Sequence, residues 1–90
     1  MVFKARGAKA GAIEARREGT IVVLSWSSRR AEALEVHVHA PDGPLFSRSG
    51  QSGEGRIDWL QEETTFFLQD VSAGLPLTLT NTLDTVTVSF

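Results

Sequence analysis

The chain has 90 residues, of which 41% are hydrophobic, 22% charged and 8% aromatic, and its formal net charge at pH 7 is −2. This length corresponds to a single domain, and the composition excludes a disordered tail, a collagen-like repeat and a span of the bilayer. Because the chain has no cysteine, it forms no disulfide framework and offers neither a thiolate metal ligand nor a cysteine nucleophile.

Charge is unevenly distributed along the chain. Residues 1–30 hold seven Lys or Arg and two Glu, a balance of +5, whereas residues 31–90 hold two Arg and nine acidic residues, a balance of −7. The pattern predicts a flexible basic arm over residues 1–11, followed by a single domain over residues 12–90. No aromatic residues for base stacking are interleaved among the basic ones, so we expect no nucleic-acid partner.

The first eleven residues also lack the apolar run of a signal peptide. We therefore expect no export signal in this chain. An extracellular or cell-surface location stays open if the chain is part of a larger exported protein.

After the arm, apolar residues alternate with period two between regularly spaced turn residues, which is typical of short antiparallel strands. The pattern predicts a short first strand at residues 12–15 and a polar turn at residues 16–19. The clearest strand covers residues 20–27, where Val22, Leu24 and Trp26 share the core face. Its other face is also fairly apolar, which indicates an interior strand.

The next predicted strand alternates strictly between apolar and polar residues. Its inner positions are Leu34, Val36 and Val38, and its outer positions are Glu35, His37 and His39. A Pro-Asp-Gly-Pro turn at residues 41–44, in which Gly43 accepts positive φ, leads into a hairpin strand at residues 45–49. Residues 47–55 are polar and rich in glycine, and they predict a mobile loop.

Three further segments complete the predicted fold. Residues 56–60 form a short strand with Ile57 and Trp59 on one face. Residues 64–70 place Phe66 and Leu68 inside and Phe67 and Gln69 outside, and residues 85–90 place Val86, Val88 and Phe90 inside. Residues 71–84 hold part of the last strand or a structured loop. About seven short strands result, which indicates an all-β sandwich or barrel.

Three short motifs in this pattern resemble those of a known family. They are Leu24-Ser25-Trp26, Thr64-Thr65-Phe66-Phe67-Leu68 and Val86-Thr87-Val88. Together they resemble bacterial immunoglobulin-like domains, with the likeness covering residues 20–90. The resemblance implies an immunoglobulin-like antiparallel β-sandwich, an inward Trp26, and Phe66 near the corner before the penultimate strand, where the family often has a tyrosine. It also implies an accessory or interaction module of a larger protein.

The histidines form the most chemically suggestive pattern. His37 and His39 are two residues apart on one predicted strand face, with Glu35 next along it. A third ligand is missing, because Glu35 and His39 lie roughly 13 Å apart in an extended strand at about 3.3 Å per residue. We therefore expect exposed strand histidines and no metal site.

Catalytic motifs are absent from the sequence. Residues 50–54 miss the last glycine of a G-x-S-x-G nucleophile turn, and the adjacent Glu62 and Glu63 point apart on a strand or turn. No phosphate-binding loop occurs. We expect neither an enzyme, nor catalytic residues, nor a cofactor.

Ligand contact is left to the aromatic residues that do not belong to the predicted core. The candidates are Trp59, Phe67 and Phe46. Phe67 is the one most expected at the surface, whereas the shared parity of Trp59 and Ile57 favours a core position for Trp59. We expect a non-catalytic interaction or structural module with a protein partner or neighbouring domain. The alternative is a carbohydrate-binding module, which needs an exposed row of aromatic rings.

Overall fold

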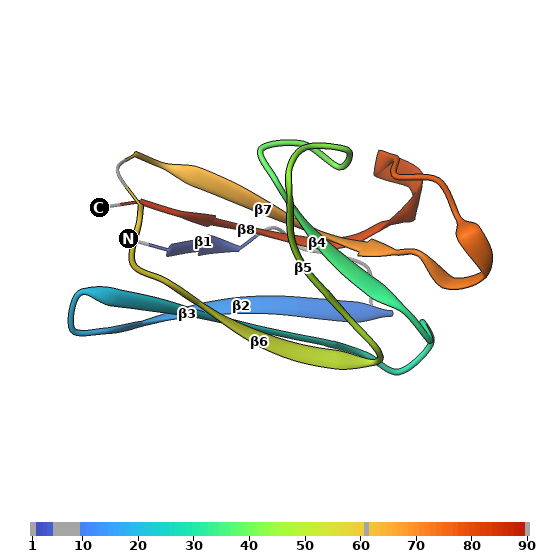
Figure 1. The fold of residues 1–90 in the computed structure, drawn as a ribbon, viewed down its shortest axis with the longest axis horizontal. Helices are drawn as coiled ribbons and strands as arrows, with labels where there is room; N and C mark the ends of the chain where they lie inside the picture. Colours follow the sequence, from blue (N-terminus) through green and yellow to red (C-terminus); the bar gives the residue numbers. More distant parts are fainter. Residues whose placement is uncertain (1, 5–9, 61, 90) are drawn as a thin grey trace.

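Two antiparallel sheets face each other across one hydrophobic core (Figure 1). The computed structural model describes the backbone of residues 2–4 and residues 10–60 and 62–89 completely. One sheet has the order β1-β8-β7-β4-β5 and the other the order β2-β3-β6. The strands are β1 (Val2–Lys4), β2 (Gly11–Glu18), β3 (Ile21–Ser28), β4 (Leu34–Val38), β5 (Leu45–Ser49), β6 (Ser52–Ile57), β7 (Thr64–Asp70) and β8 (Thr82–Val88).

The chain passes repeatedly from one sheet to the other, after β1, after β3, after β5 and after β6. Two short 3₁₀ turns, η1 (Ser72–Gly74) and η2 (Leu79–Asn81), lie between β7 and β8. The described chain is therefore an all-β antiparallel sandwich, one of the two architectures that the alternating pattern left open and the one that the family resemblance implied. Strands β2 to β8 account for the expected seven, and β1 adds a short edge strand beside β8.

The core consists of the inner faces of the two sheets. Trp26, Phe66, Leu34, Val36 and Val86 are all buried there. The predicted inward faces of β3, β4 and β7 are thus confirmed, as are Val86 and Val88 of β8, whereas Phe90 lies outside the described residues. Strand β7 has the predicted bounds, and β3 is shifted by one residue.

Strand β3 lies between β2 and β6, so its prediction as an interior strand is confirmed. On its outer face, Val23 is 0% exposed, because Arg16 and Arg56 flank it in register. Arg16 pairs with Glu18 at 2.8 Å and with Glu54 at 3.7 Å. These charged side chains and their alkyl stems cover the valine.

The predicted polar turn at residues 16–19 is wrong. Strand β2 continues to Glu18, and the hairpin turn is made at Gly19, which has φ 64°. Arg17 occupies an inner-face position, opposite Val22, at the end of the sandwich. There its guanidinium reaches out to donate to the Ser89 carbonyl at 3.0 Å, which the alternation of apolar residues does not predict.

The predicted mobile loop at residues 47–55 is also wrong. Its first part belongs to β5 and its second part to β6, which pairs with β3 over six residues from Ser52 to Ile57. Gly53 and Gly55 point inwards, where a Cβ would lie 2.6 Å from the Trp26 ring and 2.6 Å from the Phe46 ring respectively. Two large rings therefore occupy the core volume that side chains would fill.

The start of the chain departs from a simple arm. Val2–Lys4 form β1, paired antiparallel with β8, so these three residues belong to a sheet. Residues 5–9 of the predicted arm lie outside the described residues, and β2 already begins at Gly11. The division of the chain into arm and domain stays a prediction.

Candidate functional site

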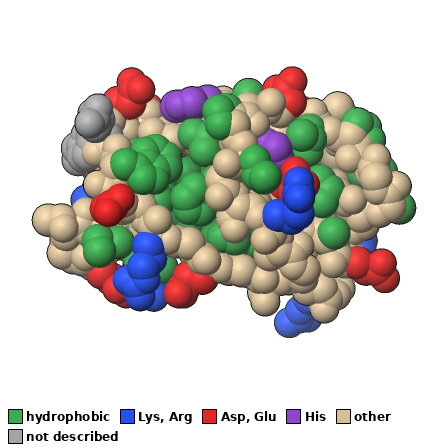
Figure 2. Space-filling view, viewed as in Figure 1, with side chains coloured by type: hydrophobic (Ala, Val, Ile, Leu, Met, Phe, Trp, Pro, Cys, Tyr) green, Lys and Arg blue, Asp and Glu red, His purple; other side chains and the backbone are tan. Residues whose placement is uncertain are grey.

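Two of the three candidate aromatics meet on the same core ring. The Phe46 ring lies 5.6 Å from the Phe66 ring, and the Trp59 ring lies 6.5 Å from the Phe66 ring. Trp59 is 49% exposed, and Phe46 is half-buried. We call Trp59, Phe46 and the half-buried Leu60 the aromatic patch. Figure 2 shows hydrophobic side chains gathered on the side of the sandwich where the gap between the two sheets faces the viewer.

Local backbone features place the patch. The register between β4 and β5 shifts after Val36, so Phe46 has no direct partner and turns towards the core. Its ring contacts Trp26 edge-on at 6.3 Å. Rings from Trp26 through Phe46 and Phe66 to Trp59 thus form a continuous row from the core to the surface. Edge-on and tilted contacts of this kind are favourable between aromatic rings.

The predicted strand at residues 56–60 is confirmed for its first two residues and wrong for residues 58–60, which explains the exposure of Trp59. Strand β6 ends at Ile57, so the parity of Ile57 and Trp59 does not extend to the latter. Trp59 belongs instead to the β6–β7 connection, beside the exposed Asp58 and before the exposed Glu62 and Glu63. The patch therefore combines an apolar platform with neighbouring carboxylates.

Phe67 lies elsewhere, on the outer face of the larger sheet, because neighbouring strand residues point to opposite faces. It is half-buried between His37 of β4 and Thr85 of β8, which are its register partners. Leu45 of β5 follows in the same cross-strand row and is 47% exposed. The three candidate aromatics do not form one site.

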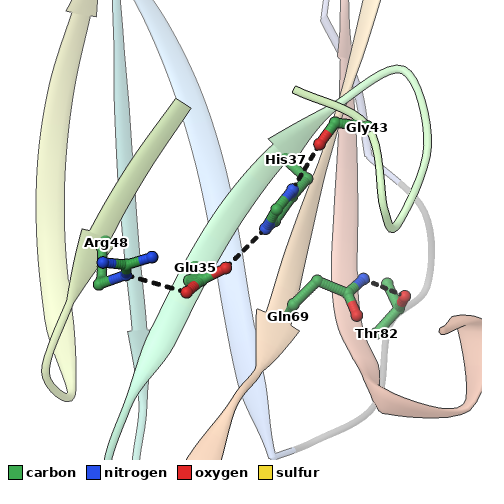
Figure 3. A network of polar contacts seen from close by, with 6 residues as sticks. All are labelled: Glu35, His37, Gly43, Arg48, Gln69 and Thr82. Atoms are coloured by element: carbon green, nitrogen blue, oxygen red, sulfur yellow. Dashed lines mark hydrogen bonds and ion pairs between the residues drawn. The ribbon is translucent and has the colours of Figure 1, made fainter. Parts of the chain in front are cut away.

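A polar network occupies this outer face along β4 (Figure 3). The Nε2 of His37 lies 2.7 Å from a carboxylate oxygen of Glu35, and its Nδ1 lies 2.7 Å from the carbonyl of Gly43. The other carboxylate oxygen of Glu35 accepts a bond of 2.9 Å from Arg48 of β5. The imidazole is thus held between a carboxylate and the β4–β5 turn.

His37 is only 4% exposed, so the expectation of two exposed strand histidines is wrong for this residue. His39 is exposed, but it lies beyond the end of β4 with φ 74°, and the two histidines do not continue one strand face. Among the residues that the structure describes, no group of three potential metal ligands occurs. The burial of His37 depends on the turn folding back over β4, which no local pattern signals.

The same network lowers the pKa of Glu35. Hydrogen bonding from His37, and secondarily from Arg48, holds the pKa of the Glu35 carboxyl below its ordinary value, although partial burial opposes the shift. Both histidine nitrogens lie 2.7 Å from an oxygen atom, so both are engaged in polar contacts. The arrangement positions the turn and leaves neither ring nitrogen available to a substrate.

The turn itself requires glycine for a reason other than the predicted positive φ. A Cβ on Gly43 would lie 2.0 Å from the carbonyl oxygen of Val38. Among the described residues, positive φ occurs instead at His39, Ala73, Gly19 and Gly74. The close approach of the backbone excludes a side chain at position 43.

Gln69 is a second buried polar residue that the alternating pattern placed outside. Its side-chain amide donates to the hydroxyl of Thr82, which in turn donates to the Thr78 carbonyl at 3.0 Å. The side-chain oxygen of Gln69, Oε1, has no hydrogen-bond partner in the described part of the chain. This chain of bonds connects the sheet to Thr78, the residue before η2, and gives the buried amide nitrogen of Gln69 a partner.

Comparisons with protein-family models, with curated proteins and with solved structures found no match. The class that the fold defines is therefore that of a small antiparallel β-sandwich, established by strand order and register. Within the described ranges, no helix is long and apolar enough to cross a bilayer.

Proposed function

We infer that this chain is a non-catalytic immunoglobulin-like module that binds a protein partner or a neighbouring domain through the aromatic patch. Strand order supports the assignment: β2, β3 and β6 correspond to strands A, B and E, and β8, β7, β4 and β5 to strands G, F, C and C′. An immunoglobulin-like sandwich hosts many unrelated roles, so the role has to be argued from the surface.

Trp59 is the observation that carries the proposal. Half of this large side chain is exposed, yet its ring is supported by Phe66, which is completely buried. Exposed aromatic rings on rigid supports are typical anchors of protein interfaces, because they bury much area at little entropic cost. The neighbouring Asp58, Glu62 and Glu63 provide a polar rim.

A photo-crosslinking experiment tests this role. Trp59 is replaced by p-benzoylphenylalanine in the protein produced in its source cells, and the same residue is introduced at exposed Asp42 as a control. We expect one discrete protein adduct from position 59 and none from position 42. Equal labelling at both positions, or no adduct at position 59, would contradict the proposal.

Carbohydrate binding is the second candidate function, and the exposed Trp59 ring beside acidic residues favours it. The ring offers a stacking face, and the carboxylates offer acceptors for sugar hydroxyls. The described patch has one exposed tryptophan and one half-buried phenylalanine, which is less than an exposed row. A glycan array probed with the protein and with Trp59→Ala discriminates the two, since sugar binding that is lost in the variant would establish this candidate instead.

A further inference from the structure

The four sheet edges of the molecule differ in how well they are protected. Strand β1 has only three residues, and on β2 the amide of Ile13 donates to the Asp84 carboxylate at 2.9 Å. Strand β5 is interrupted by a register shift at Phe46. Strands β2 and β6 both pair with β3 in an unbroken register, but β2 has the Asp84 carboxylate on its open side, which leaves β6 as the regular edge without such a contact among the described residues. Regular edges of this kind are templates for pairing with another strand.

Backbone alternation identifies the groups that β6 leaves open. The carbonyl of Gln51 accepts a hydrogen bond from the amide of Ser28 at 2.8 Å, so Gln51 faces β3. In an antiparallel ladder the backbone groups of alternate residues face the same side. Gly53, Gly55 and Ile57 therefore bond to β3, whereas the amide and carbonyl groups of Glu54 and Arg56 face away from the sheet.

We propose that β6 pairs antiparallel with β6 of a second copy of this chain, with the two-fold axis at Gly55. In this register Glu54 of each copy lies opposite Arg56 of the other, and such pairs exchange both backbone hydrogen bonds. The residues with open backbone groups are thus also the residues whose charges are complementary. A two-fold interface requires this self-complementarity.

The side chains agree with the pairing. Glu54 and Arg56 are exposed on the outer face of the sheet, and opposite charges directly across two strands are favourable. On the inner side, Gly55 has no side chain to obstruct a neighbour, and the Phe46 ring lies beneath it, 2.6 Å from where its Cβ would be. Pairing would bring the half-buried Phe46 rings of the two copies towards each other. The joined sheets would form one continuous sheet across the dimer.

Charge reversal tests the register. Sedimentation equilibrium from micromolar to millimolar concentration is measured for the protein, for Glu54→Arg, for Arg56→Glu and for the double exchange. We expect the protein to dimerise, each single variant to dimerise at least roughly tenfold more weakly, and the double exchange to recover dimerisation. Glu14→Arg, on the outer face of the far strand β2, is the control and should dimerise like the protein.

A mixing experiment guards against misfolded variants. Glu54→Arg and Arg56→Glu each dimerise weakly alone, but together they should form a tighter mixed dimer, because arginines of one copy then face glutamates of the other. Amide exchange provides a second readout, in which dimerisation slows Glu54 and Arg56 and leaves Gly53 and Gly55 unchanged. A protein that stays monomeric at millimolar concentration, or a dimer indifferent to both reversals, would overturn the proposal. The pairing does not depend on the function proposed for the aromatic patch.

Discussion

At the scale of single residues, the two inward glycines of β6 determine how the largest side chains pack. Trp26 donates from Nε1 to the Ser49 hydroxyl at 2.9 Å, which fixes its ring above Gly53. Phe46 lies above Gly55, where its ring contacts the rings of Trp26 and Phe66. A methyl group at Gly53 or Gly55 would therefore force the ring above it to shift.

Gly53→Ala should therefore destabilise the domain. The added Cβ would lie 2.6 Å from the Trp26 ring, so we expect a loss of about 1–3 kcal/mol, the usual range for overpacking. Gly50→Ala is the matched control, since its Cβ would meet nothing closer than 3.9 Å. Urea denaturation of both variants measures the difference, and an equal effect of the two substitutions would contradict the packing described for Gly53.

The lowered pKa of the Glu35 carboxyl makes the stability of the domain depend on pH in the acidic range. Its pKa is lowered in the folded state, first by the hydrogen bond from His37, so its contribution is complete above the ordinary value of 4.5 and is lost as the pH falls through the folded value. We expect the free energy of unfolding to fall more steeply below pH 4.5 in the protein than in Glu35→Gln. Denaturation curves at several acidic pH values measure the two slopes. Identical slopes, with Glu32→Gln as a control for removing a carboxylate, would contradict this role.

At the scale of secondary-structure elements, the strands differ in how clearly the sequence indicates them. Strict alternation in β4 predicts which face is buried, because one face of the sheet packs on the core and the other carries the polar residues. Strand β6 gives no such signal, since its inward residues Gly53 and Gly55 have no apolar side chain that would mark a buried face. The volume they leave is filled by Trp26 and Phe46, which are distant in the sequence.

The candidate site was less predictable than the fold for the same reason. All three candidate aromatics are recognisable in the sequence, but Phe67 lies on the outer face, and Phe46 and Trp59 come together only through contacts with Phe66. The end of β6 at Ile57 decides that Trp59 is exposed, and the turn at Gly43 decides that His37 is buried. The point at which a strand ends and the path of a turn are not encoded in the alternation of apolar and polar residues, so the sequence pattern does not predict them.

Hydrogen exchange should distinguish the strand β6 from the loop that its composition suggests. Amides of Gly53, Gly55 and Ile57 bond to β3 and should exchange slowly. Among the described residues, those of the β7–β8 connection from Ala73 to Thr80 should exchange fastest, because most of them are exposed. Exchange at Gly53 and Gly55 as rapid as at Ala73 would mean that β6 is not a stable strand.

At the scale of the whole molecule, side chains join the two sheets on both sides of the sandwich. On one side, the carboxylate of Asp84 in β8 accepts from the amide of Ile13 in β2. On the other, Trp26 of β3 reaches Ser49 of β5. At the end of the sandwich, Arg17 of β2 donates to the Ser89 carbonyl. These bonds supplement the hydrophobic core, which has no direction of its own, with contacts that fix how one sheet lies over the other.

Asp84 is the most buried of these links, and its removal should weaken the association of the sheets. Its two carboxylate oxygens accept from the amides of Ile13 and Thr85, each at 2.9 Å, and hydrogen bonds to a charged group are worth about 1.5–3 kcal/mol. We expect Asp84→Ala to lose roughly 2–3 kcal/mol of unfolding free energy. Asp84→Asn, which keeps one acceptor oxygen, should lose less. Exposed Asp58→Ala serves as the control and should stay within about 0.5 kcal/mol of the protein. If urea denaturation places Asp84→Ala beside that control, the carboxylate does not hold the two sheets together.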